Sequence, residues 1–486
     1  MSGEEVNLKE VGITIDKYVC EKNFHDLEFF LDSLKSVVSN YVKTSQFALF
    51  YYLGTGYSEL SNHYFQKNNP NQSRRFKELS FTYFRSSISA LQDVRRNDHT
   101  NVSPQEEMIY TNYALALLGC DRVIEAIRVL RHAIECNPEF GMALASYGGC
   151  LNFYAQLCNN TTDKNILHYH ANLYIKRALS LNDPNMYPDA KEHYQKISEA
   201  YDNTDWQGWH IKQGNIGVSK RERSYRQWCL DKHLFLTPLN DLIETENSYA
   251  EDSLVITQCI EPISNEPPKW FAMLNQLKEE YIFLRYLYYE SLDLRKRPHF
   301  ADKRVAISSA SYDYALYSIR QEQLKICFKN LYSILDQIAF VVNAYWNLGF
   351  EVYQASAANV FKSNEHFQGN SMLLALYWSY REFWEKFEDS SKAYERDLKC
   401  LRNALEHRFV KVVALAQRTE AIFEHDDFVF VEEKTLQKYV LRMLQLTREW
   451  IICLVYAINI EEMKKESPLD KAVCLTVNDF PDSLKL

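Results

Sequence analysis

The side chains in this chain best suited to chemistry are Arg402, Asn403 and His407, which fall within the hexapeptide RNALEH at residues 402–407. An arginine stays charged under all working conditions and stabilises negative charge that develops on phosphorus. Histidine, whose ordinary pKa is about 6.5, can move the proton of a ribose 2′-hydroxyl or of a leaving oxygen. The asparagine amide can orient either group. Together these groups predict metal-free cleavage of a phosphodiester, and the need for a 2′-hydroxyl makes RNA the expected substrate.

Apolar periodicity predicts one helix from Asp397 to Val413, with the motif inside it. Its apolar stripe consists of Leu398, Leu401, Leu405, Phe409 and Val412. At about 100° per residue, Asn403 and His407 share a face, whereas Arg402 lies about 140° round the helix from His407. One regular helix cannot aim both groups at one phosphate. Either the helix is distorted near Arg402, or a two-fold dimer brings two copies of the motif together.

The pattern Arg-Asn-x-x-x-His at residues 402–407 resembles the signature of the HEPN superfamily (higher eukaryotes and prokaryotes nucleotide-binding). The stretches Arg226–Leu242, Lys325–Leu348 and Asn370–Trp384 look like the segments that precede this motif in that family. The resemblance covers the chain from Arg226 onward and is to a HEPN subfamily fused to tetratricopeptide-like repeats. It implies a C-terminal HEPN helical bundle.

The resemblance also implies an activity and an assembly. The expected protein is a metal-independent RNA endonuclease that needs no cofactor and is controlled by its repeat domain. Many relatives serve as toxins or as effectors of anti-phage defence. The implied homodimer forms its cleft along two motif helices, where His407 acts as acid or base. Arg402 binds the phosphate, and Asn403 orients the imidazole or the backbone.

Three further residues are supporting candidates for this site. Asp336 lies in an apolar helical run and needs a partner, for which Arg402 is a candidate. Glu406 either raises the pKa of His407 or is solvated on the helix surface. Arg408 adds positive charge beside the motif.

Composition and repeats predict an all-α fold. Glycine (13) and proline (12) are scarce and aromatic residues reach 14%, which favours long helices over turn-rich sheets. Residues 110–138 have the small and large apolar spacing of a tetratricopeptide unit, a second unit starts at Phe140, and a degenerate one precedes them. We therefore expect three regions: a repeat domain at 1–200, a connector packed on the C-terminal domain at 201–268, and the HEPN domain at 269–486.

Stacked helix pairs leave a concave groove that commonly holds a peptide or a protein partner. The aromatic side chains that either line this groove or fill the core between helices are Tyr51, Tyr52, Tyr57, Tyr83 and Phe84.

The overall charge restricts the kinds of partner. A net charge of -9 is not the broad basic surface of a protein that coats nucleic acid, so contact with RNA must be local. Eleven cysteines without framework or zinc-site spacing indicate a reducing, cytoplasmic location and predict no metal site. The first residues lack a signal-peptide pattern, and no apolar run approaches the roughly 20 residues that a bilayer requires, so no membrane association is expected.

Two other functions stay open. One is a non-catalytic dimeric scaffold or nucleotide-binding module that recruits a protein partner through its repeats. The other is regulation by a separate nucleotidyl transferase that modifies residues near the motif.

Overall fold

The structure is a computed structural model, and it divides into two units by contacts between residues. It describes residues 8–97, 105–181, 183–184, 186–202, 204, 216–262, 269–293, 299–306, 315–362, 365–390, 393–414, 422–425, 427–465 and 472–476. The N-terminal unit comprises residues 1–156, 165–208 and 385–393, and the C-terminal unit comprises 157–164, 209–384 and 394–486. Each unit thus includes a short segment whose sequence neighbours belong to the other.

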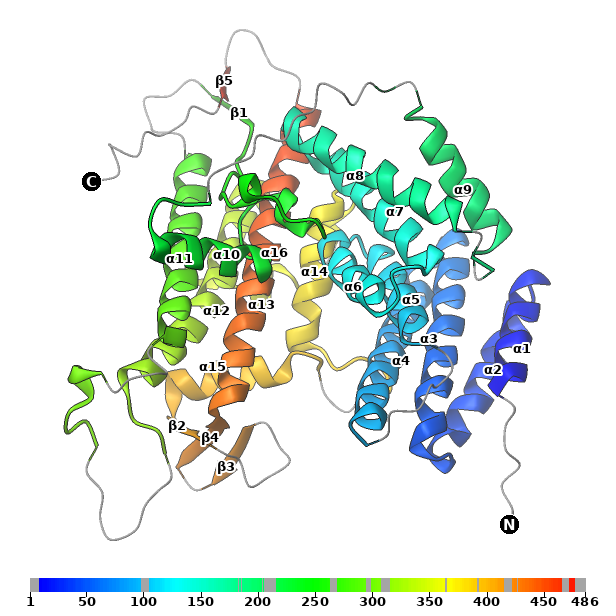
Figure 1. Ribbon diagram of the computed structural model, residues 1–486, viewed down its shortest axis with the longest axis horizontal. Coiled ribbons are helices and arrows are strands. Elements are labelled where there is room, and N and C mark those ends of the chain that lie inside the picture. Colours follow the sequence, from blue (N-terminus) through cyan, green and yellow to red (C-terminus); the bar gives the residue numbers. More distant parts are fainter. Residues whose placement is uncertain are drawn as a thin grey trace. The chain divides into compact units, whose positions relative to one another are not determined.

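The described part of the N-terminal unit is helical (Figure 1). Its elements are α1 (Leu8–Cys20), α2 (Phe24–Val37), η1 (Val38–Asn40), α3 (Lys43–Gln66), α4 (Pro70–Asn97), α5 (Glu106–Leu118), α6 (Val123–Cys136), α7 (Gly141–Leu157), α8 (Thr161–Ser180) and α9 (Pro188–Glu199). Helix α3 packs along α4, and α5 packs along α6. Helix α7 approaches α8 closely, because a Cβ on Gly148 would lie 2.7 Å from Ile175.

Apolar spacing in the sequence explains this packing. The repeat positions between residues 110 and 138 that have no exposed surface are Ala114, Leu117, Ala126, Leu130 and Ala133. Gly54 lets α3 approach α4, since a Cβ there would lie 2.9 Å from the ring of Phe84. The helix pairs lie where the sequence predicts repeats, while their assignment as tetratricopeptide units remains a prediction.

The five aromatic residues divide between core and cavity. Tyr57 and Tyr83 are buried in the core formed with α1 and α2. Tyr51, Tyr52 and Phe84 line a cavity, although Tyr51 and Phe84 are themselves largely buried. Both hypotheses for this aromatic set therefore apply, each to different members.

The C-terminal unit is built round one long helix, α16 (Glu433–Lys464), which contacts α11 (Lys269–Asp293), α12 (Ile319–Trp346) and α14 (Ser371–Trp384). The remaining helical elements are α10 (Lys220–Asp231), η2 (Pro238–Asp241), η3 (Asn247–Tyr249), η5 (Phe300–Asp302), η6 (Val352–Gln354), α13 (Ala357–Val360), η7 (Glu365–Phe367) and α15 (Arg396–His407). Among the described helices, α16 alone is long and apolar enough to cross a membrane, but 83% of its most apolar window is buried, as in a core helix.

Two small sheets accompany these helices. Strands β1 (Gln258–Pro262) and β5 (Ala472–Thr476) pair antiparallel. In the second sheet β2 (Phe409–Val413) pairs parallel with β4 (Phe428–Glu432), which pairs antiparallel with β3 (Ile422–His425). Despite these strands, the fold is all-α, as the sequence predicts.

Two buried arginines attach the segment before β1 to the helices of this unit. Arg448 on α16 donates to both carboxylate oxygens of Asp241 at 2.8 and 3.0 Å. Arg285 on α11 binds Asp252 in the same bidentate way, both bonds at 2.8 Å. Burying a charge requires a partner, so these pairs fix the segment to α11 and α16.

Candidate active site

The motif lies on α15, whose first turn is fixed by α16. Glu395, directly before the helix, accepts hydrogen bonds of 2.9 and 2.8 Å from the guanidinium of Arg442. Its backbone N–H donates to the carbonyl of Glu382 at 2.8 Å. The Tyr439 hydroxyl donates to Asp397 at 3.2 Å. These bonds set the position from which the motif residues project.

The helix ends at His407, six residues before the predicted end at Val413. From Phe409 onward the chain is strand β2, in register with β4 from Phe428. The prediction of a continuous helix was wrong because Phe-Val-Lys-Val-Val favours a strand once a partner strand is present. Phe409 is consequently 73% exposed instead of completing the apolar stripe.

Arg402 lies on the flank of α15 that faces α12. Its guanidinium carbon is 5.5 Å from the centre of the Tyr332 ring, within cation–π range. It also donates to the side-chain oxygen of Asn403 at 3.2 Å. This hydrogen bond turns the guanidinium toward the face that Asn403 occupies.

Asn403 and His407 are exposed on one face of α15, as the four-residue spacing predicts. His407 is the last residue of the helix. The described helix runs without interruption through Arg402. Distortion of the helix is therefore excluded as the way to unite the motif.

The supporting candidates have other partners. Asp336 accepts a hydrogen bond of 2.9 Å from the backbone N–H of Ala357 and has no ion pair with Arg402 in the described structure. The hypothesis that Asp336 pairs with Arg402 was wrong, because this carboxylate instead satisfies the first turn of α13. Glu406 forms an ion pair with Lys329 at 3.1 Å. Neither supporting acid is thus bonded to the motif.

Arg408 is the first residue after α15 and is exposed. Its backbone N–H donates to the carbonyl of Ala404 at 2.8 Å and completes the last helical turn. The backbone at Arg408 is extended, which starts the turn of the chain into β2.

The structure places two further side chains beside the motif that the sequence analysis does not single out. Tyr332 is 5% exposed and lies beneath the guanidinium of Arg402; burial chiefly raises the pKa of its hydroxyl. Lys399, about one turn before Asn403, lies 3.6 Å from the centre of the Trp384 ring, and burial lowers the pKa of its ammonium. In the sequence, only the position of Lys399 one helical turn before Asn403 indicates that it lies near the motif.

One group in the N-terminal unit has metal-ligating side chains at short separations. His132 lies 3.3 Å from Glu106, and Cys136 lies 3.7 Å from His132. Arg95 forms an ion pair with Glu106. Burial, and then the charge of Glu106, raise the pKa of the Cys136 thiol to about 12. Arg95 already supplies a positive charge to Glu106, and the raised pKa keeps the Cys136 thiol protonated. The three side chains are therefore poorly suited to bind a metal ion.

Taken together, the C-terminal unit is an α-helical domain that presents Arg-Asn-x-x-x-His at the end of one helix. Residues 262–461 match the family model described as LA2681-like HEPN, and the chain therefore carries a HEPN-family domain in this region. No curated protein and no solved structure matches the chain. The match begins at residue 262, after the segment that contains Asp241 and Asp252, the partners of Arg448 and Arg285. That segment nevertheless belongs to the same unit by its contacts.

Proposed function

We propose that this protein is a metal-independent RNA endonuclease. The observation that carries the proposal is the motif in a HEPN-family domain: a guanidinium turned toward Asn403, and an exposed imidazole on the same face. These are the groups that phosphodiester cleavage without a metal requires.

The proposed reaction is attack by a ribose 2′-hydroxyl on its own 3′-phosphate. The new P–O bond closes a 2′,3′-cyclic phosphate as the bond to the 5′-oxygen breaks. His407 removes the hydroxyl proton or protonates the leaving oxygen. Arg402 stabilises the charge on the phosphoryl oxygens, and Asn403 holds the guanidinium in position.

A two-fold homodimer through the HEPN domain is part of this proposal. On a regular helix Arg402 starts about 140° from His407, and a single side-chain hydrogen bond closes only part of that separation. A second copy of the motif helix, related by a two-fold axis, would bring an arginine and a histidine to one phosphate from different chains.

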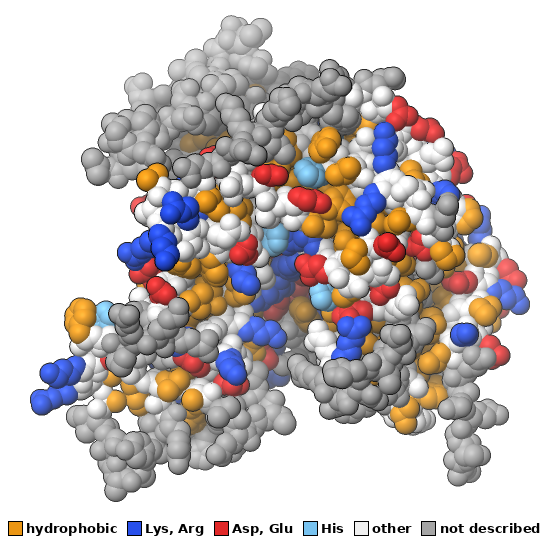
Figure 2. All heavy atoms as spheres, in the orientation of Figure 1, with side chains coloured by type: hydrophobic (Ala, Val, Ile, Leu, Met, Phe, Trp, Pro, Cys, Tyr) orange, Lys and Arg blue, Asp and Glu red, His pale blue; other side chains and the backbone are white. Residues whose placement is uncertain are grey.

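RNA contact in this proposal is local. Basic and acidic side chains are interspersed over the described face in view in Figure 2. Near the motif, Lys399 and Arg402 on α15 and Lys411 on β2 add positive charge. We expect few phosphate contacts and therefore a shallow dependence of RNA affinity on salt concentration.

The test compares cleavage of total RNA by wild type, Arg402→Ala, His407→Ala and the matched control Arg396→Ala, an exposed arginine on the same helix. Each motif variant should lose at least about a hundredfold in rate, as for a lost acid–base or charge-stabilising group, and the control should retain activity. Cleavage by both motif variants at the wild-type rate would refute the assignment. Mixing the two inactive variants tests the dimer, since shared sites should restore part of the activity.

Control by the N-terminal unit would act through the chain segment that precedes α15. Residues 385–393 leave α14 and belong by their contacts to the N-terminal unit. Arg75 binds Glu388 at 2.8 and 2.9 Å, while Lys35 and the Tyr83 hydroxyl bind Asp389 at 2.6 and 2.9 Å. We propose that these bonds tie the start of the motif helix to the state of the repeats.

The biological setting we propose is a toxin or anti-phage effector, on the strength of the HEPN resemblance. Induced expression in a bacterial host should arrest growth with wild type but not with Arg402→Ala. The second candidate is a non-catalytic scaffold that recruits a protein through its repeats, which the net charge of -9 favours. A stoichiometric protein partner without any loss of RNA would support it. A mass increase of the intact protein would instead indicate nucleotidyl transfer near the motif.

A further inference from the structure

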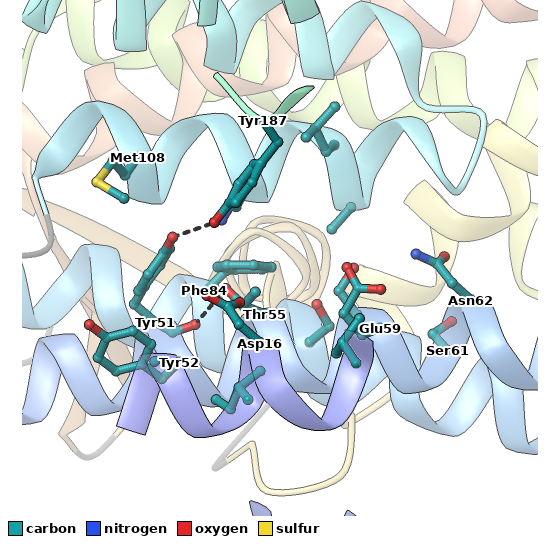
Figure 3. Close-up of a pocket in the computed structure, with 18 of the residues that line it drawn as sticks. Asp16, Tyr51, Tyr52, Thr55, Glu59, Ser61, Asn62, Phe84, Met108 and Tyr187 are labelled. Atoms are coloured by element: carbon teal, nitrogen blue, oxygen red, sulfur yellow. Dashed lines mark hydrogen bonds between the residues drawn. The ribbon is translucent and has the colours of Figure 1, made fainter. Parts of the chain in front are cut away.

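The N-terminal unit contains a cavity that the proposed nuclease reaction does not use. Its volume is about 770 Å³, and it is bounded by α1, α3, α4, α5, the start of α7 and Tyr187 (Figure 3). This volume lies within the range of small-molecule sites in proteins, roughly 300 to 1,000 Å³. The cavity is large enough for an organic ligand.

Two carboxylates line one side of the cavity: Asp16 of α1, which is exposed, and Glu59 of α3, which is partly buried (Figure 3). In the part of the chain that the structure describes, neither has a hydrogen bond or an ion pair. Burial, and then repulsion by Asp16, raise the pKa of Glu59. Burial also raises the pKa of Asp16. A cation bound between them would relieve both effects.

Two lysines, Lys77 and Lys9, also line the cavity. The ammonium of Lys77 donates to the carbonyl of Gly119 at the end of α5, and its charge lowers the pKa of Asp121. Lys9 is exposed on the first turn of α1. Neither lysine is among the causes that shift the pKa of these carboxylates: burial raises that of Asp16, and burial and then repulsion by Asp16 raise that of Glu59.

Aromatic rings form the next part of the wall. The rings of Tyr51 and Tyr52 lie 5.3 Å apart, with their planes inclined at 57°. Tyr187, which is 66% exposed, faces them from the other side of the cavity (Figure 3). Aromatic faces attract organic cations through the ring quadrupole. Apolar contacts are available from Met108 and Leu115 of α5.

We propose that this cavity binds a small organic amine whose ammonium lies between Asp16 and Glu59 and whose apolar body packs against the tyrosines and α5. The chemistry of the wall favours an amine over the other ligand classes. A divalent metal such as Ca²⁺ needs six to eight oxygen ligands, more than two carboxylates provide. The two carboxylates would repel a phosphate-bearing ligand, and a neutral ligand would leave the partly buried Glu59 without a partner.

Calorimetric titration of the full chain tests the proposal with three probes of similar shape. These are 2-phenylethylamine as the cation, 2-phenylethanol as its neutral analogue and 3-phenylpropionate as the anion. The amine should bind at millimolar or lower concentration and at least about tenfold more tightly than the alcohol, as expected for a charge-assisted contact. The anion should not bind.

Variants then locate the site. Glu59→Gln and Asp16→Asn should each weaken amine binding about tenfold, whereas Glu10→Gln, an exposed acid on α1 outside the cavity, should leave it unchanged. Thermal unfolding of each variant checks that the fold is retained. Equal affinity for amine and alcohol, or unaltered amine binding by both cavity variants, would overturn the assignment. So would binding of a lysine-bearing peptide without a response to the free amine.

Discussion

Replacing Arg448 should destabilise the C-terminal unit more than most single substitutions. Its guanidinium donates to Phe235 O at 2.6 Å, to Thr237 O at 2.7 Å, and to both oxygens of Asp241. Both charged side chains are only 3% exposed. In Arg448→Met the Asp241 carboxylate would remain buried without its main partner, which costs about 3 to 5 kcal/mol. That is a large part of the roughly 5 to 15 kcal/mol that stabilises a typical domain.

Urea unfolding followed by tryptophan fluorescence measures this effect. Trp450, two residues further along α16, is 1% exposed and donates to the hydroxyl of Ser379 at 2.9 Å, so it should report loss of this core. The double variant Arg448→Met/Asp241→Leu removes both charges. It should recover about 1 to 3 kcal/mol relative to the single variant, because no unpaired carboxylate remains.

Two results would refute this reasoning. A loss below about 1 kcal/mol in Arg448→Met would mean that the ion pair contributes little beyond an exposed one. A double variant at least as unstable as the single one would mean that the cost arises from lost packing, and not from an unpaired buried charge.

Three further predictions concern stability and control. Burial raises the pKa of Asp121 to about 6, partly offset by Lys77, so the folded state holds a proton that the unfolded state releases above about pH 4. Asp121→Asn should therefore stabilise the protein by about 1 to 2 kcal/mol at pH 7.5. Thermal melting should show this gain disappearing as the pH falls from about 6 to 4. A stability difference that does not depend on pH would contradict the prediction. Arg442→Met should loosen the start of α15 and lower the rate of RNA cleavage with a smaller effect on RNA affinity; unchanged kinetics would show that this anchor does not position the motif. Arg75→Ala should change the cleavage rate through the segment held at Glu388, and identical rates with and without the substitution would remove that segment from the proposed control.

The character of the C-terminal domain could be predicted from a short pattern and its context. The RNALEH sequence pointed to HEPN, and the match over residues 262–461 supports that assignment. Two stretches that resemble the segments before the motif in that family, Lys325–Leu348 and Asn370–Trp384, coincide with most of α12 and with α14. Apolar periodicity is a local property of the chain, and helices can therefore be predicted from the sequence.

The strand that follows the motif and the side chains that contact it could not be predicted in this way. Strand β2 forms because β4 pairs with it, and the partner strand is nineteen residues further along the chain at Phe409↔Phe428. Tyr332 lies beneath Arg402 because α12 packs against α15, and Asp336 is diverted to Ala357 by the course of the chain after α12. Such contacts join residues far apart in sequence and carry no local pattern.

By itself, the sequence determined the helical class, the residue types on which the proposed phosphodiester cleavage rests, and the shared face of Asn403 and His407, because residue type and helical pitch are local. Only the tertiary structure decided where the motif helix ends, which side chains flank Arg402, and that Asp16 and Glu59 line one cavity. It also decided that residues 385–393 belong to the other unit. Those outcomes depend on which distant surfaces pack together, and that is set by the burial of the whole chain rather than by any one segment.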